Sequence, residues 1–171
     1  MKSALWVLLL LPGVVRAQVP AWAAEELSRV VGVWEADNSA YVSETEPDLA
    51  YRQEWRAGPG GHSATGRLYG MLHGEETGEY WQFRLFWDPG TERLRLMQWS
   101  ASGIVGDGLF TQTGPDRNEV LQTFTSQDGT SWMQGHRNRN ESDDQHIGTS
   151  YGVSEDGAWT RERTYTWRRI R

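Results

Sequence analysis

From Gly32 onward, apolar and polar residues alternate along much of the chain with a period of two, which is typical of β-strands with one buried face. The clearest case is 51–56, where Tyr51, Gln53 and Trp55 share one face and three charged residues share the other. Turn signals rich in Gly, Pro, Asn and Asp recur between such runs, at 58–61, 74–78, 88–90, 102–103, 114–116, 128–129, 140–143 and 156–157. The pattern predicts antiparallel strands joined in sequence by hairpins.

Counting these runs gives about ten strands. They lie around Trp34, Trp55, Tyr69 and Phe110 and at 80–87, 94–99, 120–125, 131–137, 147–153 and 160–167; the inward face of 93–99 is left open because both faces hold apolar residues. An open sheet of this kind would expose two long edges, and closure removes them. The predicted fold is all-β, an antiparallel up-and-down meander closed into a barrel with an internal cavity. A β-sandwich remains the alternative.

Two segments depart from the strand pattern. Residues 20–30 carry Trp22, Ala23, Leu27 and Val30 at helical spacing, which predicts a short N-terminal helix ended by Gly32. The segment from Asn38 to Asp48 is polar, and we expect it to form a loop over one end of the barrel.

The first seventeen residues have the composition of a secretory signal peptide. Lys2 precedes an apolar run at 4–15, and Val15-Arg16-Ala17 provides a cleavage site with small residues. The apolar run is too short for a membrane span, which needs about 20 residues. The sequence therefore predicts a signal peptide at 1–17 and a single domain at 18–171, exported to a periplasm or secreted.

Composition then excludes several kinds of chemistry. The chain has no cysteine, and Lys2 is its only lysine. Without the signal peptide, 15 arginines face 23 acidic residues, so a formal charge of −6 becomes −8. Thiol nucleophiles, disulfides and lysine Schiff bases are excluded from the exported chain. The acidic balance argues against nucleic acid or anionic membrane as partners, and the oligomeric state is left open.

The alternation also predicts which side chains line the cavity. The inward face of 51–55 continues on other strands through Trp81, Phe83 and Leu85, through Trp132, Gln134 and His136, and through Tyr165 and Trp167, with Arg161 and Arg163 nearer the mouth. The predicted ligand-binding residues are Tyr51, Gln53, Trp55, Trp81, Phe83, Trp132, Gln134, His136, Arg163 and Tyr165. Burying polar groups without partners costs about 1–3 kcal/mol each, so a ligand with a flat apolar body and a polar or anionic end would explain them. Mutual satisfaction of the polar groups, with tryptophan as filler, is the alternative.

Several motifs run through the chain in a recognisable order. They are Gly32-Val33-Trp34 after a short helix, Glu54-Trp55, the run 66–70, the run 124–129 and the closing 165–168. In this order they resemble a family of bacterial exported lipocalin-like (calycin-type) domains of unknown function. The Gly-x-Trp motif is similar to the lipocalin signature, with Arg168 or Arg169 expected to pack over Trp34. The resemblance implies a calycin-type barrel and transfers no catalytic residue.

No cofactor and no metal site is predicted from the sequence. Haem-binding nitrobindin barrels are related to lipocalin-like barrels and need a proximal histidine that points into the cavity. His136 and His146 are the candidates by position, and no motif supports either. The polar hairpin from His136 to His146 contains carboxylates, amides and two imidazoles, but its spacing fits neither an EF-hand nor a zinc motif.

Two further motifs lack the context that their chemistry needs. Gly148-Thr149-Ser150-Tyr151-Gly152 matches the Gly-x-Ser-x-Gly nucleophile elbow in letters, but it lies within an alternating β segment and no histidine follows the serine. His73-Gly74-Glu75 lacks the cysteines that complete a zinc-deaminase site. No catalytic residue is assigned.

The sequence thus favours an exported small-molecule binding or carrier protein that holds an amphipathic or aromatic ligand in the barrel lumen. A barrel enzyme of isomerase, cyclase or hydratase type, using a lumen histidine such as His136, is the first alternative. A protein-interaction module that presents its exposed loops is the second.

Overall fold

The computed structural model describes residues 19–171; the predicted signal peptide at 1–17 lies outside the described residues. One helix, α1 (Ala21–Arg29), precedes ten strands, and two single-turn 3-10 helices, η1 (Ser39–Tyr41) and η2 (Pro59–Gly61), lie in loops. The strands are β1 (Gly32–Asp37), β2 (Ala50–Ala57), β3 (Ser63–Leu72), β4 (Glu75–Asp88), β5 (Arg93–Ser100), β6 (Val105–Gly114), β7 (Arg117–Thr125), β8 (Ser131–Ser142), β9 (Gln145–Val153) and β10 (Trp159–Arg169).

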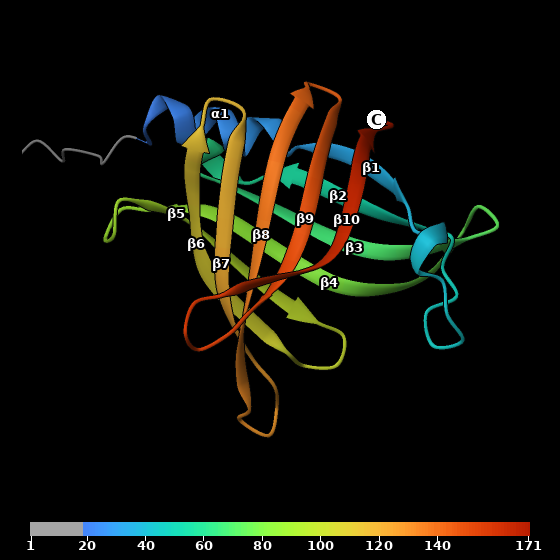
Figure 1. Ribbon diagram of the computed structural model, residues 1–171. Helices are drawn as coiled ribbons and strands as arrows, with labels where there is room; N and C mark the ends of the chain where they lie inside the picture. Colours follow the sequence, from blue (N-terminus) through green and yellow to red (C-terminus); the bar gives the residue numbers. More distant parts are fainter. Residues whose placement is uncertain (1–18) are drawn as a thin grey trace, which may run out of the picture.

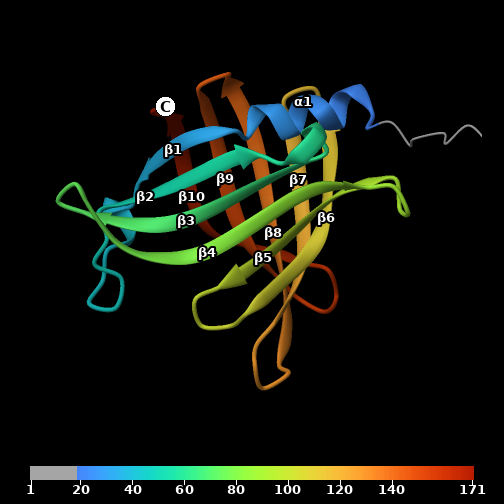
Figure 2. The ribbon, with the colours of Figure 1, turned by 180° about the vertical axis from the view of Figure 1, so that it is seen from behind.

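The strands pair in sequence order, all antiparallel, and β1 pairs with β10 to close the barrel. Trp34 lies opposite Arg169 at this closure. Beyond this pair, the Ile170 amide donates a hydrogen bond of 2.8 Å to the Val33 carbonyl oxygen. Figures 1 and 2 show the strands wrapped around a common interior. The predicted closed meander is confirmed, and the sandwich alternative is wrong.

The helix α1 lies across the barrel end at which β1 begins (Figures 1 and 2). Its buried face carries Ala23, Glu26 and Leu27, and Trp22 meets Trp87 of β4 edge-to-face, with ring centroids 6.0 Å apart. Ala23 and Leu27 are almost fully buried, so helix packing removes apolar surface from water at this end. We call it the helix end.

The polar segment between β1 and β2 crosses the other end. Residues 38–49, here called the strap, contain η1 and lie between the two strands where the sequence predicts a loop. Asn38 and Asp48, at its two ends, are fully buried. Asn38 Nδ2 donates to the Asp48 carbonyl oxygen over 2.9 Å, which joins the two ends of the strap.

Close packing inside the barrel depends on glycine at specific strand positions. A Cβ atom at Gly66 of β3 would lie 2.6 Å from the Trp55 ring. A Cβ atom at Gly106 of β6 would lie 2.6 Å from the Phe124 ring. Both distances are shorter than atoms tolerate, so these glycines provide the space into which the two aromatic rings fit.

Among residues 19–171, no helix has the length and apolar character that crossing a membrane requires.

Candidate functional site

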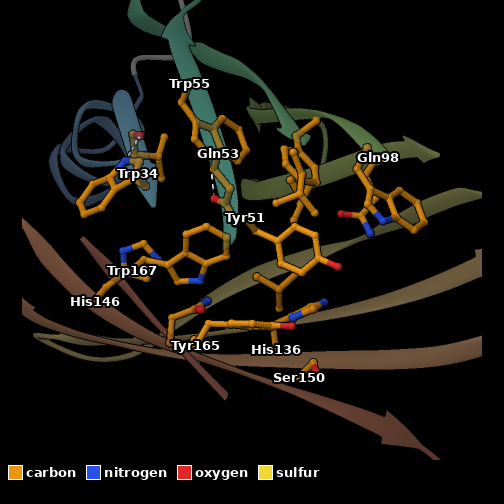
Figure 3. Close-up of a pocket in the computed structure, with 18 of the residues that line it drawn as sticks. Trp34, Tyr51, Gln53, Trp55, Gln98, His136, His146, Ser150, Tyr165 and Trp167 are labelled. Atoms are coloured by element: carbon orange, nitrogen blue, oxygen red, sulfur yellow. Dashed lines mark hydrogen bonds between the residues drawn. The ribbon is translucent and has the colours of Figure 1, made fainter. Parts of the chain in front are cut away.

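The interior of the barrel holds a cavity of about 800 Å³. All ten strands, α1 and the strap contribute to its lining. Ligand pockets are typically about 300–1,000 Å³, so the space suits one drug-sized molecule. Figure 3 shows side chains from several strands converging on it.

Nine of the ten predicted ligand-binding residues line this cavity: Tyr51, Gln53, Trp55, Trp81, Phe83, Gln134, His136, Arg163 and Tyr165. Trp132 does not. Its side chain is 40% exposed and stacks on Phe124, with ring centroids 5.7 Å apart and planes inclined by 16°. Phe124 in turn meets Trp81 edge-to-face, so the three rings form a chain that connects the cavity lining with the exterior. Whether the nine residues bind a ligand remains a prediction.

One side of the lumen is mostly apolar, although the amides of Gln53, Gln98 and Asn118 also line the cavity there. Trp55 and Phe83 stack with ring centroids 5.1 Å apart, and Leu85, Phe110 and Val120 are nearly fully buried beside the cavity. Leu68 and Leu96 complete this surface. We call it the apolar wall; it belongs to β2–β7.

The facing side, on β8–β10, is mostly polar, with Tyr165 and Trp167 as its aromatic members. His136 of β8 and Ser150 of β9 are directly paired across the sheet and both line the cavity, as do Gln134 and Glu162 (Figure 3 labels the first two). Gln134 Nε2 donates to Glu162 Oε2 over 2.9 Å. No hydrogen bond of the His136 ring is found within residues 19–171. We call this surface the polar wall.

A β-bulge in β10 corrects the prediction for the arginines. The register with β9 shifts by one residue between Arg161 and Thr164. Because a one-residue shift exchanges the two faces of a strand, Arg161 is exposed and away from the cavity while Glu162 and Arg163 both line it. Arg161 and Arg163 therefore do not share the inward face. Strict alternation could not reveal Glu162, since the sequence carries no separate signal for the bulge.

Arg163 ties the strap to the barrel. Its guanidinium forms a bidentate ion pair with Glu46 of the strap: Nη1 donates to Oε1, and Nη2 donates to Oε2 over 2.8 Å. The Tyr51 hydroxyl also donates to Glu46, over 2.5 Å. The Arg163 guanidinium holds the pKa of Glu46 below its usual range, and burial raises the pKa of Tyr51. The sequence marked this segment only as polar, so it gave no signal for Glu46.

A second acid of the strap is bound by neighbouring hydroxyls. Asp48 accepts hydrogen bonds from Tyr80 and from Thr77, the latter over 2.6 Å. The hydrogen bond to Asp48 raises the pKa of Tyr80 to about 12. Tyr165 donates to Asn38 Oδ1 over 2.9 Å. Much of the strap's polar interior is therefore satisfied within the chain.

The two lumen histidines are uncharged at neutral pH. Burial lowers the pKa of His136 to about 4, although the negative charge of Glu162 acts in the opposite direction. Burial, with a smaller effect of Arg169, also lowers the pKa of His146 to about 4. Neither imidazole brings a positive charge to the cavity at pH 7.

His146 belongs to an aromatic cluster near the helix end. Its ring stacks against Trp167, with centroids 6.2 Å apart, and meets Trp34 edge-to-face at 4.8 Å. The Arg169 guanidinium lies 4.2 Å from the centre of the Trp34 ring, which identifies the arginine that covers the Gly-x-Trp tryptophan. Trp34 Nε1 donates to the Val30 carbonyl over 2.9 Å, so this ring holds α1 against the barrel.

The Gly-x-Ser-x-Gly match and the candidate metal ligands do not have the geometry of a catalytic or metal site. Ser150 lies in the middle of β9, without the strand-turn-helix that a nucleophile elbow needs, and its Oγ accepts the Arg163 amide over 3.3 Å. In the part of the chain that the structure describes, no three His, Asp or Glu side chains converge as metal ligands do.

Comparison with known proteins supports the fold and gives no information on function. The crystal structure of Rv2717c from M. tuberculosis is similar, with a TM-score of 0.52 over 87% of this chain and 98% of that one. The two sequences are 15% identical. At this identity the similarity shows the fold alone. No protein family matches the sequence, and no curated protein does.

Proposed function

We propose that this protein is an exported, lipocalin-like carrier that holds one amphipathic or aromatic small molecule in the lumen of its barrel. The single observation that carries the proposal is the cavity of about 800 Å³ with an apolar wall facing a polar wall. Export to a periplasm or beyond rests on the composition of residues 1–17.

The arrangement of the two walls supports binding over simple filling. A core that existed only for stability would pack its polar groups against each other, because unpaired polar groups are costly in a dry interior. The strap follows that rule, but the His136 ring faces the cavity without a protein partner found in 19–171. An apolar molecule with a polar end would contact both walls at once.

Binding in the lumen can be tested by filling it. The purified protein is titrated with N-phenyl-1-naphthylamine, an uncharged flat fluorophore that brightens in apolar surroundings. We expect saturable binding of one probe per chain. Ser150→Phe, which places a ring in the cavity, is expected to weaken binding at least ten-fold. Ser131→Phe, at an exposed position at the start of β8, is the matched control and is expected to bind like the unmodified protein.

Equal binding by both variants and the unmodified protein would place the probe outside the lumen and contradict the proposal. Circular dichroism melting of the two variants checks that each one folds.

Catalysis in the same cavity is the second candidate, and one new observation favours it. The bulge brings the Glu162 carboxylate into the lumen near His136, where the sequence alone offered no acid partner. An imidazole whose pKa is about 4 is, however, a weak general base at neutral pH, since catalytic bases work best with a pKa near the working pH. Carriage therefore remains the better supported function.

A further inference from the structure

We infer that the lumen selects a ligand whose polar end is an amine cation rather than an anion. The inference rests on the proposed function and adds the charge of the ligand to it. It depends on how the charged side chains of the cavity are already paired.

Five charged residues line the cavity, and four of them have partners of opposite charge. At the helix end, Arg29 Nη2 lies 2.7 Å from Glu25 Oε1, and Arg29 Nε lies 4.0 Å from Oε1 of the lining residue Glu26. At the strap end, Arg163 is held by both oxygens of Glu46. An anionic ligand would have to displace one of these carboxylates before it could use an arginine.

The fifth charged residue, Glu162, has no ion-pair partner among residues 19–171. Its Oε2 atom accepts one hydrogen bond, from Gln134, and no partner of Oε1 is found in this range. The side chain lines the cavity and is also exposed, so it lies where the cavity opens to solvent. Because Arg163 is already paired with Glu46 and the neighbouring imidazole of His136 is uncharged, Glu162 leaves one unpaired negative charge on the polar wall.

Indole rings line the same cavity as this carboxylate. Trp55 and Trp81 line the same cavity, and Trp132, which lies outside the lining, stacks on Phe124, which meets Trp81 edge-to-face. Tryptophan faces attract cations more strongly than other aromatic rings do. A lumen that combines an unpaired carboxylate with indole rings in its lining is a favourable environment for an ammonium group and an unfavourable one for a carboxylate or phosphate.

The buried donors at the helix end do not change this conclusion. Arg29 Nε and Asn140 Nδ2 lack partners within residues 19–171, but both atoms are buried out of reach of solvent. The charge of Arg29 is matched by its acidic neighbours, so this end offers no free positive charge to an anion.

The test compares three probes with the same ring system. 2-(1-Naphthyl)ethylamine, 2-(1-naphthyl)ethanol and 1-naphthaleneacetate carry a cationic, a neutral and an anionic end at pH 7. Isothermal titration calorimetry with the purified protein is expected to give the tightest binding for the amine and the weakest for the acid. We expect a ratio of at least ten between the dissociation constants of the acid and the amine.

The variant Glu162→Gln tests whether this carboxylate causes the tighter binding of the amine. Glutamine keeps an oxygen that can accept the Gln134 hydrogen bond, so the fold should be undisturbed. In this variant the amine is expected to lose most of its advantage over the acid, while the affinity for the alcohol stays within two-fold. Glu92→Gln changes the net charge equally in the exposed β4–β5 turn at the helix end, and it is expected to leave the ratio unchanged.

The outcomes separate the two proposals. If the alcohol binds but the acid binds as tightly as the amine, or if Glu162→Gln leaves the ratio unchanged, the inference about charge is wrong and the carrier function stands. If none of the three probes binds, both proposals are contradicted.

Discussion

The apolar wall and the polar wall of the lumen are built on the same strand geometry but use their inward positions differently. On the apolar wall, side chains such as Leu85 and Phe110 are 3% and 5% exposed and pack against one another. On the polar wall, His136 and Ser150 face open space and Glu162 reaches solvent. One half of the lumen stabilises the barrel through buried apolar contacts, whereas the other half presents polar groups to the cavity.

The largest expected effect is a difference in stability between the walls. Leu85→Ala should lower the free energy of unfolding by about 2–5 kcal/mol, because it removes buried methyl groups and enlarges a cavity. Gln134→Ala removes a hydrogen bond to the exposed Glu162 and should cost less than about 1 kcal/mol. Urea denaturation of both variants measures the two values. Similar losses at the two positions would remove the distinction between the walls.

The next largest effect is a loss of stability at acid pH, which arises from the two buried imidazoles. In the unfolded chain a histidine takes up a proton near pH 6.5, whereas His136 and His146 in the fold do so only near pH 4. The unfolded state therefore binds more protons between pH 6.5 and 4, and stability falls as the pH drops through that window. The loss is about 3 kcal/mol at most for each histidine.

Replacing one imidazole sharpens this prediction. His136→Asn should flatten the fall in stability between pH 6.5 and 4, as followed by thermal melting at several pH values. His62→Asn, at an exposed position beside η2, should leave the profile unchanged. A profile for His136→Asn that follows the unmodified protein would show that this ring is not held uncharged by burial.

A smaller effect is expected at the strap, which belongs to neither wall. Glu46→Gln removes the charge that pairs with Arg163, and because both side chains are partly exposed the free energy of unfolding should fall by only about 1 kcal/mol. Local opening should be easier to detect, as faster amide hydrogen exchange at 38–49. Glu44→Gln, at an exposed strap position, is the control. Unchanged exchange in Glu46→Gln would mean that the ion pair does not hold the strap.

Much of the fold could be predicted from the sequence, because strand alternation and turn residues are local signals. The pattern at Tyr51, Gln53 and Trp55 places all three in the lining, and Gly-x-Trp indicated the contact between Trp34 and an arginine of the last strand. The polar segment 38–48 was predicted as a loop, and it is the strap.

The errors come from features that alternation cannot encode. The bulge in β10 turned Arg161 outward and brought in Glu162, because one extra residue reverses the faces of a strand. Trp132 was predicted to face inward by alternation, but it lies beyond the cavity. Alternation indicates the face of a strand and not how far along the barrel a residue lies. The partner of Arg163 is Glu46, 117 residues away, and no local pattern pairs them.

Native mass spectrometry of the purified protein shows whether the lumen carries a small molecule. The measurement is made before and after incubation with 2-(1-naphthyl)ethylamine and 2-(1-naphthyl)ethanol, and a visible absorption spectrum of the same sample would reveal haem by its Soret band. We expect one bound molecule per chain, either copurified or added, that is lost in Ser150→Phe. A protein that shows only the mass of the chain in every sample would contradict it.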